Sequence, residues 1–197
     1  MSDTIQPMTD YEVELKFPIA APADVAARLT ALGASRGSEL AQADQYFAHP
    51  VRRFEQTDEA LRIRTEGEHN CLTYKGPLLD RATKTRQEIE LDVASGPEGS
   101  HRLWAILRAL GFVDVFTVRK RRTVFKLRWE GRDFSLSLDV VEQLGDFLEI
   151  ETMAGPNDWE AARDCALRLA AALDLTTSER RSYLQLLLAQ TSQVAAP

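Results

Sequence analysis

Two glutamates and a lysine alternate with apolar residues near the start of the 197-residue chain, in the stretch YEVELKF at residues 11–17. In a β-strand Glu12, Glu14 and Lys16 would share one face, with successive members roughly 7 Å apart at ~3.3 Å per residue. Carboxylates are the hard oxygen ligands that divalent metals prefer, and a neighbouring lysine can contact an anion that the metal holds. A solvated sheet surface is the alternative interpretation, because it gives the same alternation.

The same alternation recurs in strands that we predict at 60–65, 71–75, 86–93, 119–129, 134–140 and 147–151. Nearly every strand follows it, and the charges are sorted by sign. If the sheet closes into a barrel, the charged faces meet across an enclosed lumen, which suits a polyanion with metal ions between it and the carboxylates. The basic residues on these faces are Arg62, Arg64, Lys75, Arg86, Lys120, Arg122, Lys126 and Arg128, and the acidic ones are Glu88, Glu90, Asp92, Asp139, Glu149 and Glu151.

A triphosphate is one polyanion that would suit this pattern. A nucleoside triphosphate or inorganic triphosphate carries about four negative charges near neutral pH, and arginine forks match its oxygens. The net charge of the whole chain is −6, so bulk electrostatics do not favour nucleic acid or an anionic membrane as a partner.

The composition is that of an ordinary globular protein. The two cysteines indicate no disulfide framework, and a cytoplasmic location fits them better than secretion. The opening MSDTIQPMTD has no signal-peptide pattern, and no apolar run is long enough to span a bilayer. The three histidines show no metal-ligand spacing.

The charged strands must be positioned by other elements of one α+β domain, predicted at residues 11–189. We expect disordered ends at 1–10 and 190–197, and a mobile loop at 78–84 that carries Lys84. DQYF at 44–47 predicts a short strand, and 48–59 predicts a loop. Asn157 and Glu160 are spaced as a capping box. Helices are predicted at 22–33, 100–110, 155–175 and 178–189, with Gly33 and Gly111 as stops for the first two.

Eight motifs in order resemble the CYTH superfamily, whose members are also called triphosphate tunnel metalloenzymes. The resemblance covers about residues 11–188. YEVELKF, LGDFLEI and RSY look most like the class IV adenylyl cyclases. The motifs are E-x-E-x-K, DQYF, ALRIR, YKGP, R-x-E-I-E, V-R-K-R-R, LDVVEQLGDFLEIE and RSYLQLL.

The resemblance implies an eight-stranded antiparallel closed β-barrel, open at both ends, with a charged lumen and helices packed outside. It also implies that Mg²⁺ or Mn²⁺ is bound by Glu12, Glu14 and Glu149, with Glu151 as an addition. Glu88 and Glu90 could serve the metal or balance neighbouring arginines. Phosphate would be contacted by Lys16, Arg62, Arg64, Lys75, Lys84, Arg86, Lys120 and Arg122.

By the same resemblance, the chain converts ATP to cyclic AMP and pyrophosphate. Lys16, Lys120 and Arg122 would then stabilise the reacting phosphates, and Asp139 would orient or deprotonate the nucleophile, unless it is only a salt-bridge partner of an arginine. An inorganic or thiamine triphosphatase uses the same lumen groups, and a polyphosphate- or nucleotide-binding module without turnover is a third alternative. Family analogy is compatible with a homodimer, although the sequence indicates no interface.

Overall fold

The computed structural model describes residues 11–79 and 83–194, and in this part of the chain five helices accompany eight strands. The predicted N-terminal segment 1–10 and residues 80–82 of the predicted loop lie outside the described residues. In chain order the elements are β1 (Tyr11–Pro18), α1 (Pro22–Ala31), β2 (Ser35–Ala48), α2 (Phe54–Thr57), β3 (Ala60–Glu66), β4 (His69–Lys75), β5 (Arg86–Val93), α3 (Gly96–Ala109), β6 (Val113–Trp129), β7 (Arg132–Val141), β8 (Gly145–Ala154), α4 (Trp159–Ala172) and α5 (Tyr183–Val194).

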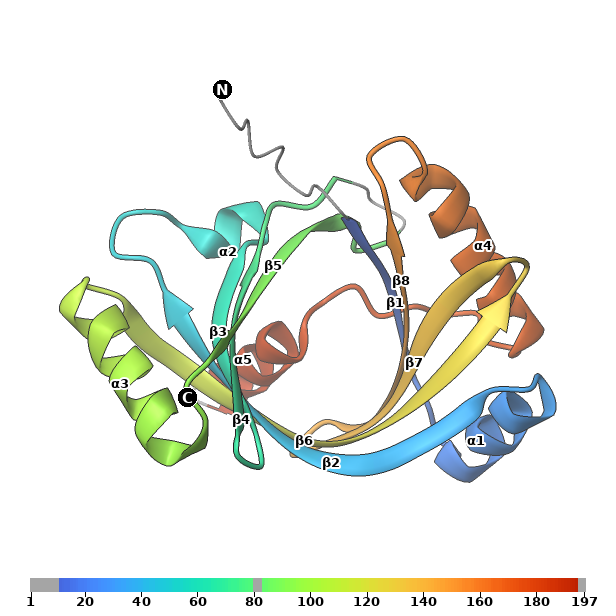
Figure 1. Ribbon diagram of the computed structural model, residues 1–197, viewed down its shortest axis with the longest axis horizontal. Coiled ribbons are helices and arrows are strands. Elements are labelled where there is room, and N and C mark those ends of the chain that lie inside the picture. Colours follow the sequence, from blue (N-terminus) through green and yellow to red (C-terminus); the bar gives the residue numbers. More distant parts are fainter. Residues whose placement is uncertain (1–10, 80–82, 195–197) are drawn as a thin grey trace, which may run out of the picture.

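The eight strands form one closed antiparallel barrel in the order β1-β5-β4-β3-β2-β6-β7-β8 (Figure 1). This confirms the predicted α+β barrel. The N-terminal strand therefore pairs with the last strand, and Glu14 lies directly opposite Glu151 in the β1–β8 ladder.

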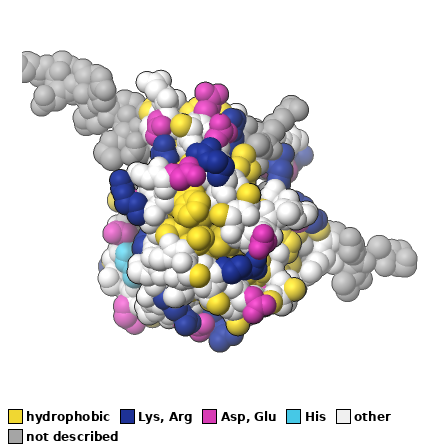
Figure 2. All heavy atoms as spheres, turned by 90° about the vertical axis from the view of Figure 1, so that its right-hand side faces the viewer, with side chains coloured by type: hydrophobic (Ala, Val, Ile, Leu, Met, Phe, Trp, Pro, Cys, Tyr) yellow, Lys and Arg dark blue, Asp and Glu magenta, His cyan; other side chains and the backbone are white. Residues whose placement is uncertain are grey.

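The apolar face of β1 packs outwards against α1 and α4, which lie on the right in Figure 1. Val13 and Leu15 belong to this core, and each fully buried aliphatic side chain of this kind contributes ~1.5–3 kcal/mol. Helix α4 presents a stripe at helical spacing, made of Ala162, Cys165, Ala166, Leu169 and Ala170. On the outer face that carries α1 and α4, hydrophobic side chains lie among charged groups of both signs (Figure 2).

Helix α3 covers the opposite side of the barrel. Leu107 of this helix packs with Phe47 and Ile63 of β2 and β3. Because the apolar faces on both sides point towards helices, the alternate faces of the same strands are left to line the lumen. None of the described helices is long and apolar enough to cross a membrane.

The contact between β1 and β5 is a narrow seam. Only Tyr11 and Glu12 of β1 pair with β5, at Gln87 and Arg86. Beyond these pairs, two connecting segments satisfy the edge of β1. The amide of Lys84 donates to the Glu14 carbonyl at 3.0 Å, and the amide of Glu179 donates to the Lys16 carbonyl at 2.7 Å.

Helix α5 lies between the two walls of the barrel in Figure 1. Its Tyr183 and Leu187 pack against lumen-side residues of four strands, including Val118 and Phe147. This apolar cluster places α5 against the lumen side of the barrel. That the barrel is open at both ends stays a prediction.

Two strands begin far earlier than predicted. β2 begins at Ser35 instead of residue 44, because its exposed first half is held by pairing with β6 and not by an apolar pattern of its own. β6 begins at Val113 instead of residue 119 for the same reason.

Three helix predictions need correction. α3 begins at Gly96, four residues before the predicted Ser100, because Pro97 is tolerated in a first turn. The cap of α4 is Asp158, and no side-chain hydrogen bond caps this helix, so the predicted capping box at Asn157 and Glu160 is wrong. α5 begins at Tyr183 instead of residue 178 and runs to Val194, past the predicted domain end at residue 189. Residues 195–197 lie outside the described residues.

Candidate active site

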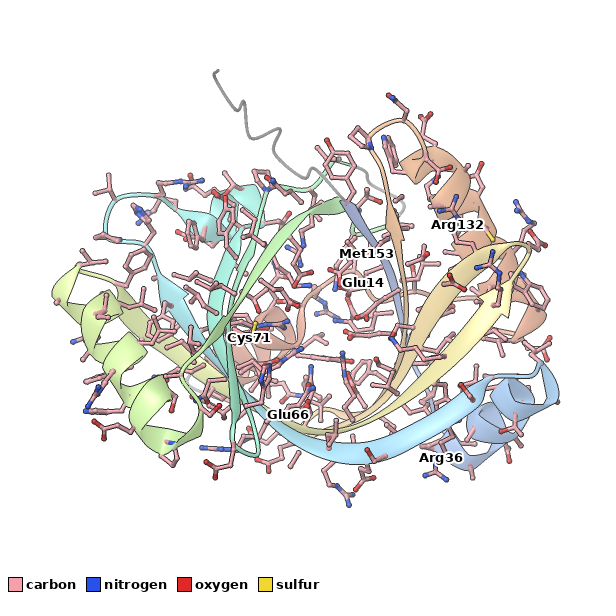
Figure 3. All side chains as sticks on the ribbon, in the orientation of Figure 1. Glu14, Arg36, Glu66, Cys71, Arg132 and Met153 are labelled. Carbon is pink, nitrogen blue, oxygen red and sulfur yellow. The ribbon has the colours of Figure 1, made fainter. Side chains whose placement is uncertain are left out.

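A cavity of about 750 Å³ occupies the lumen and continues to a mouth between α2 and α5. Its lining among the described residues includes nine acidic and nine basic side chains, so neither sign of charge dominates. Every predicted site residue lines this cavity except Asp139. Figure 3 shows Glu14 between the barrel walls, whereas Arg36 lies at the periphery of the molecule.

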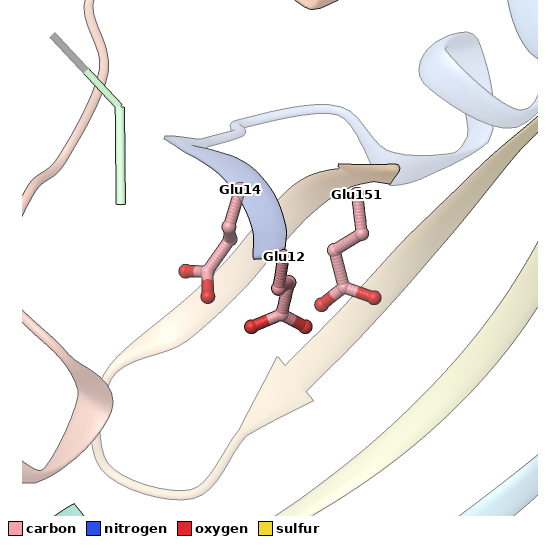
Figure 4. A group of neighbouring side chains, drawn as sticks. All are labelled: Glu12, Glu14 and Glu151. Carbon is pink, nitrogen blue, oxygen red and sulfur yellow. The ribbon is translucent and has the colours of Figure 1, made fainter. Parts of the chain in front are cut away.

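Three carboxylates converge on one wall of the lumen. Glu12, Glu14 and Glu151 offer oxygens that all lie within 4.8 Å of one another (Figure 4). Strand alternation puts Glu12 and Glu14 on the same face of β1, and the β1–β8 register brings Glu151 beside them. Glu149, the other predicted ligand, lies outside this group of three because its carboxylate accepts a hydrogen bond from Arg122.

The three carboxylates differ in electrostatic environment. Burial, with the charge of Glu88 adding to it, raises the pKa of Glu12 to about 7. Burial also raises the pKa of Glu151 to about 8, with Glu12 and Glu149 adding to the effect. Burial would raise the pKa of Glu14 too, but Lys84 and Lys75 outweigh it and hold that pKa well below its usual value.

A divalent cation fits this group of residues. The donors are all hard carboxylate oxygens, as Mg²⁺ and Mn²⁺ prefer. The raised pKa values of Glu12 and Glu151 mean that their negative charges lack full compensation in the metal-free protein, and a bound cation would supply it.

Glu151→Gln is expected to stabilise the metal-free protein at pH 8 but not at pH 5. The folded-state pKa of Glu151 lies above its unfolded value of about 4.5, so ionising this carboxyl destabilises the fold increasingly as the pH rises from about 4.5 to about 8. Glutamine carries no proton to lose. Thermal unfolding with EDTA at both pH values measures the effect, with the exposed mouth residue Glu55→Gln as the control. An equal change at pH 5 and pH 8 contradicts the assignment.

Two lysines contact the carboxylates of β1. Lys75 Nζ lies 2.6 Å from Glu12 Oε2 and 2.6 Å from Glu88 Oε2, and Lys84 Nζ lies 2.7 Å from Glu14 Oε1. Glu88 also lies 3.8 Å from Arg62, so it balances a neighbouring arginine, which was one of its two predicted roles, in addition to Lys75. Glu90 lies near Arg62 at 4.0 Å and accepts a hydrogen bond from Thr73.

Arg122 is the centre of a buried network on β6, β7 and β8. Its guanidinium donates to both oxygens of Asp139, at 2.7 and 2.6 Å, and to Glu149. Asp139 also accepts a hydrogen bond of 2.9 Å from the hydroxyl of Tyr183. Asp139 is thus a salt-bridge partner of a lumen arginine, the alternative that the sequence left open, and it lies behind Arg122 and not on the cavity wall.

Lys16 has a different environment from the other lysines. Its ammonium donates to the Arg181 carbonyl and lies 4.2 Å from the centre of the Tyr183 ring. Burial, with the charge of Lys84 adding to it, lowers the pKa of Lys16 to about 7. Burial and the nearby Arg122 likewise lower the pKa of Lys120 to about 8. A phosphate would stabilise the charged form of both amines.

Asp44 is an important residue to which the sequence analysis gave no role. Its carboxylate is almost fully buried and accepts two hydrogen bonds from Arg64, at 2.6 and 2.8 Å. Arg62 lies 3.3 Å away and Lys120 lies 3.4 Å away. One carboxylate therefore orients three cations on the wall formed by β2, β3 and β6. Strand alternation could have found Asp44, because it places this aspartate on the same strand face as Tyr46, which lines the cavity.

Two arginines have unused hydrogen-bonding capacity. The Nε atoms of Arg62 and Arg86 are buried and have no partner among the described residues. Arg86 otherwise donates to the Asp58 carbonyl at 2.8 Å. Buried donors without a partner are costly, so these two groups indicate where an anion would bind.

The protein is a closed barrel whose lumen holds paired cations and carboxylates, and this combination places it among the tunnel-type barrels. Comparison with known families agrees, because the model of the CYTH domain matches residues 10–183. The chain belongs to the CYTH domain family, whose members bind triphosphate substrates and use a metal ion.

Known relatives span nearly the whole chain. A protein of Methanocaldococcus jannaschii, named provisionally as an adenylate cyclase, is 36% identical over 178 residues, which are 89% of this chain and 97% of that protein. The adenylate cyclase CyaB of Aeromonas hydrophila is 27% identical, over 88% of this chain and 86% of its own. A solved structure from Pyrococcus horikoshii has a TM-score of 0.80 and 35% identity, and covers 91% of this chain and 99% of its own.

Proposed function

We propose that this protein is a metal-dependent adenylyl cyclase that converts ATP to cyclic AMP and pyrophosphate. The observation that carries the proposal is the lumen itself, in which a group of three carboxylates and buried arginines with unused donors face one cavity. The names of the Methanocaldococcus and Aeromonas relatives support the cyclase over other triphosphate reactions.

The triphosphate chain would lie along the basic wall. Arg62 and Arg86 donate from their unpartnered Nε atoms, and Lys120 adds a third cation. Asp44 holds Arg62 and Arg64 in place, so these arginines need little reorganisation when the substrate binds.

Glu12, Glu14 and Glu151 would hold Mg²⁺ or Mn²⁺, which lowers the pKa of the attacking ribose hydroxyl and neutralises phosphate charge when bound. Arg122 and Lys16 stabilise the charge that develops on the leaving pyrophosphate. Asp139 contributes through Arg122 by fixing one edge of its guanidinium with two hydrogen bonds.

Hydrolysis of a terminal phosphate remains the second candidate, because the same lumen groups can bind the same chain and water can attack the γ-phosphorus instead. The Nε atoms of Arg62 and Arg86 favour a phosphate ligand without selecting the attacking group. The organic part of the substrate is what separates the two reactions.

Product analysis tests the proposal. Purified protein is incubated with ATP and, separately, with inorganic triphosphate, each with Mg²⁺ or Mn²⁺, and the products are separated by chromatography. Equal amounts of cyclic AMP and pyrophosphate from ATP support the cyclase. Orthophosphate from either substrate without cyclic AMP overturns it in favour of a triphosphatase, and binding without turnover indicates a binding module. Glu14→Gln protein, purified in parallel, reports any contaminating activity.

A further inference from the structure

Internal cations occupy two of the three carboxylates that we assign to the metal. Lys84 contacts Glu14 at 2.7 Å, and Lys75 bridges Glu12 and Glu88 at 2.6 Å to each. The side chains of the Lys75–Glu12 and Lys84–Glu14 pairs are largely buried, so water screens these contacts poorly. In this state the lysines serve as counter-ions for the metal ligands.

An ammonium and a divalent metal compete for the same carboxylate oxygens. Lys84 Nζ lies at hydrogen-bond distance from Glu14 Oε1. If this oxygen were a metal ligand, it would bind the ion in place of the ammonium. Two ammonium charges close to a bound divalent ion would also repel it. We therefore expect a bound metal to weaken the contacts of these two lysines with the carboxylates.

An anionic substrate would be a new partner for the displaced ammonium groups in this cavity. Lys75 and Lys84 line the same cavity as Arg62 and Arg86, whose unpartnered Nε atoms indicate the anion site. The backbone of Lys84 is anchored to β1, because its amide donates to the Glu14 carbonyl. Its flexible four-carbon side chain can thus swing without a movement of the strand.

We propose that Lys75 and Lys84 are exchangeable counter-ions, which pair with Glu12 and Glu14 in the metal-free protein and transfer to phosphate oxygens when a metal and a triphosphate bind. This inference rests on the proposed function of the same lumen. It has a thermodynamic consequence. If a metal binds alone, the displaced lysines have no phosphate to pair with, which is unfavourable. If a triphosphate binds alone, the carboxylates that the lysines leave have no cation, which is also unfavourable. Each ligand therefore strengthens the binding of the other by the same factor.

Lys84→Met tests the exchange without any turnover. Mn²⁺ is titrated into the protein at pH 8 without phosphate, by calorimetry or by the electron paramagnetic resonance of free Mn²⁺. Removal of the competing ammonium is expected to tighten Mn²⁺ binding about tenfold, since a buried charge-assisted contact is lost from the metal-free state alone. Lys126→Met is the matched control, because Lys126 is exposed and bonds to Ser135.

The second measurement repeats the titration with imidotriphosphate, an analogue of inorganic triphosphate that resists hydrolysis. In the wild-type protein the analogue is expected to tighten Mn²⁺ binding, and in Lys84→Met this enhancement should fall about tenfold because one transferred contact is missing. Lys84→Gln is the second variant if Lys84→Met does not fold, since glutamine keeps a hydrogen-bond donor for Glu14 but carries no charge.

The outcomes distinguish a failure of the counter-ion exchange from a failure of the proposed function. If wild-type protein binds Mn²⁺ but the Lys84 variants bind it no more tightly, the counter-ion exchange is overturned while the proposed function stands. If wild-type protein binds no Mn²⁺ even with the analogue, the metal-dependent function is overturned and the exchange with it. Tighter Mn²⁺ binding together with a smaller enhancement supports the exchange.

Discussion

Glu14→Gln removes metal-dependent turnover of a triphosphate, by about 10³-fold or more, while the barrel still folds. Glu14 is a member of the group of three carboxylates, and nearby lysines keep its pKa well below the usual value, so it is ionised at neutral pH. Glutamine has nearly the same shape but no charge, and losing one charged group that acts directly on the reacting centre typically costs 10²–10³-fold or more. Steady-state assays with Mg²⁺ and Mn²⁺ measure the loss.

Circular dichroism and thermal unfolding show whether the Glu14→Gln barrel remains intact. Glu55→Gln is the matched control, because Glu55 lines the mouth of the same cavity but is exposed and pairs with Arg53. Unchanged activity in Glu14→Gln would remove Glu14 from the metal site.

Arg122→Met destabilises the protein by about 3–5 kcal/mol, because it leaves buried carboxylates without their cation. The guanidinium bonds to both oxygens of Asp139 and to Glu149, and it lies 3.9 Å from Glu151. Burial would lower the pKa of Arg122, but these carboxylates outweigh it and raise that pKa further, so the arginine stays charged. Urea unfolding at neutral pH measures the change.

Arg122→Lys separates the structural role of Arg122 from its contact with phosphate. Lysine keeps the charge but cannot bond to two carboxylate oxygens as a planar fork. We expect a smaller loss of stability than in Arg122→Met, together with a KM for the triphosphate that rises about tenfold or more. A loss of less than ~1 kcal/mol in Arg122→Met would contradict the network. An unchanged KM in Arg122→Lys would make Arg122 purely structural.

Much of the lumen could be predicted from the sequence because side-chain alternation is a local property. Once YEVELKF is a strand, Glu12, Glu14 and Lys16 must share a face, and the outward face must be covered by helices. The same rule placed the arginines of β3 and the acids of β8 on the cavity wall, where the structure has them. The closed barrel itself was expected from the resemblance to a family.

Tertiary contacts decide the parts that sequence reasoning missed. The first half of β2 is exposed and owes its strand conformation to its partner β6. Whether Glu149 or Glu151 joins the other two carboxylates depends on where the guanidinium of Arg122 lies, and no sequence spacing encodes that. The start of α5 is delayed because Glu179 is engaged with the edge of β1, which lies more than 160 positions earlier in the chain.

The pairing of β1 with β8 also constrains how the protein is made. Tyr11 meets Ala154, and Lys16 meets Glu149, so these contacts close loops of well over one hundred residues. Contacts so distant in sequence have a high entropic cost and form slowly. During synthesis β1 emerges long before its partner β8 exists. The apolar face of β1 cannot be buried until β8 and α4 have been made. Glu14 and Glu151 become neighbours only at this late step, so the proposed metal site would exist only in a chain that has finished folding.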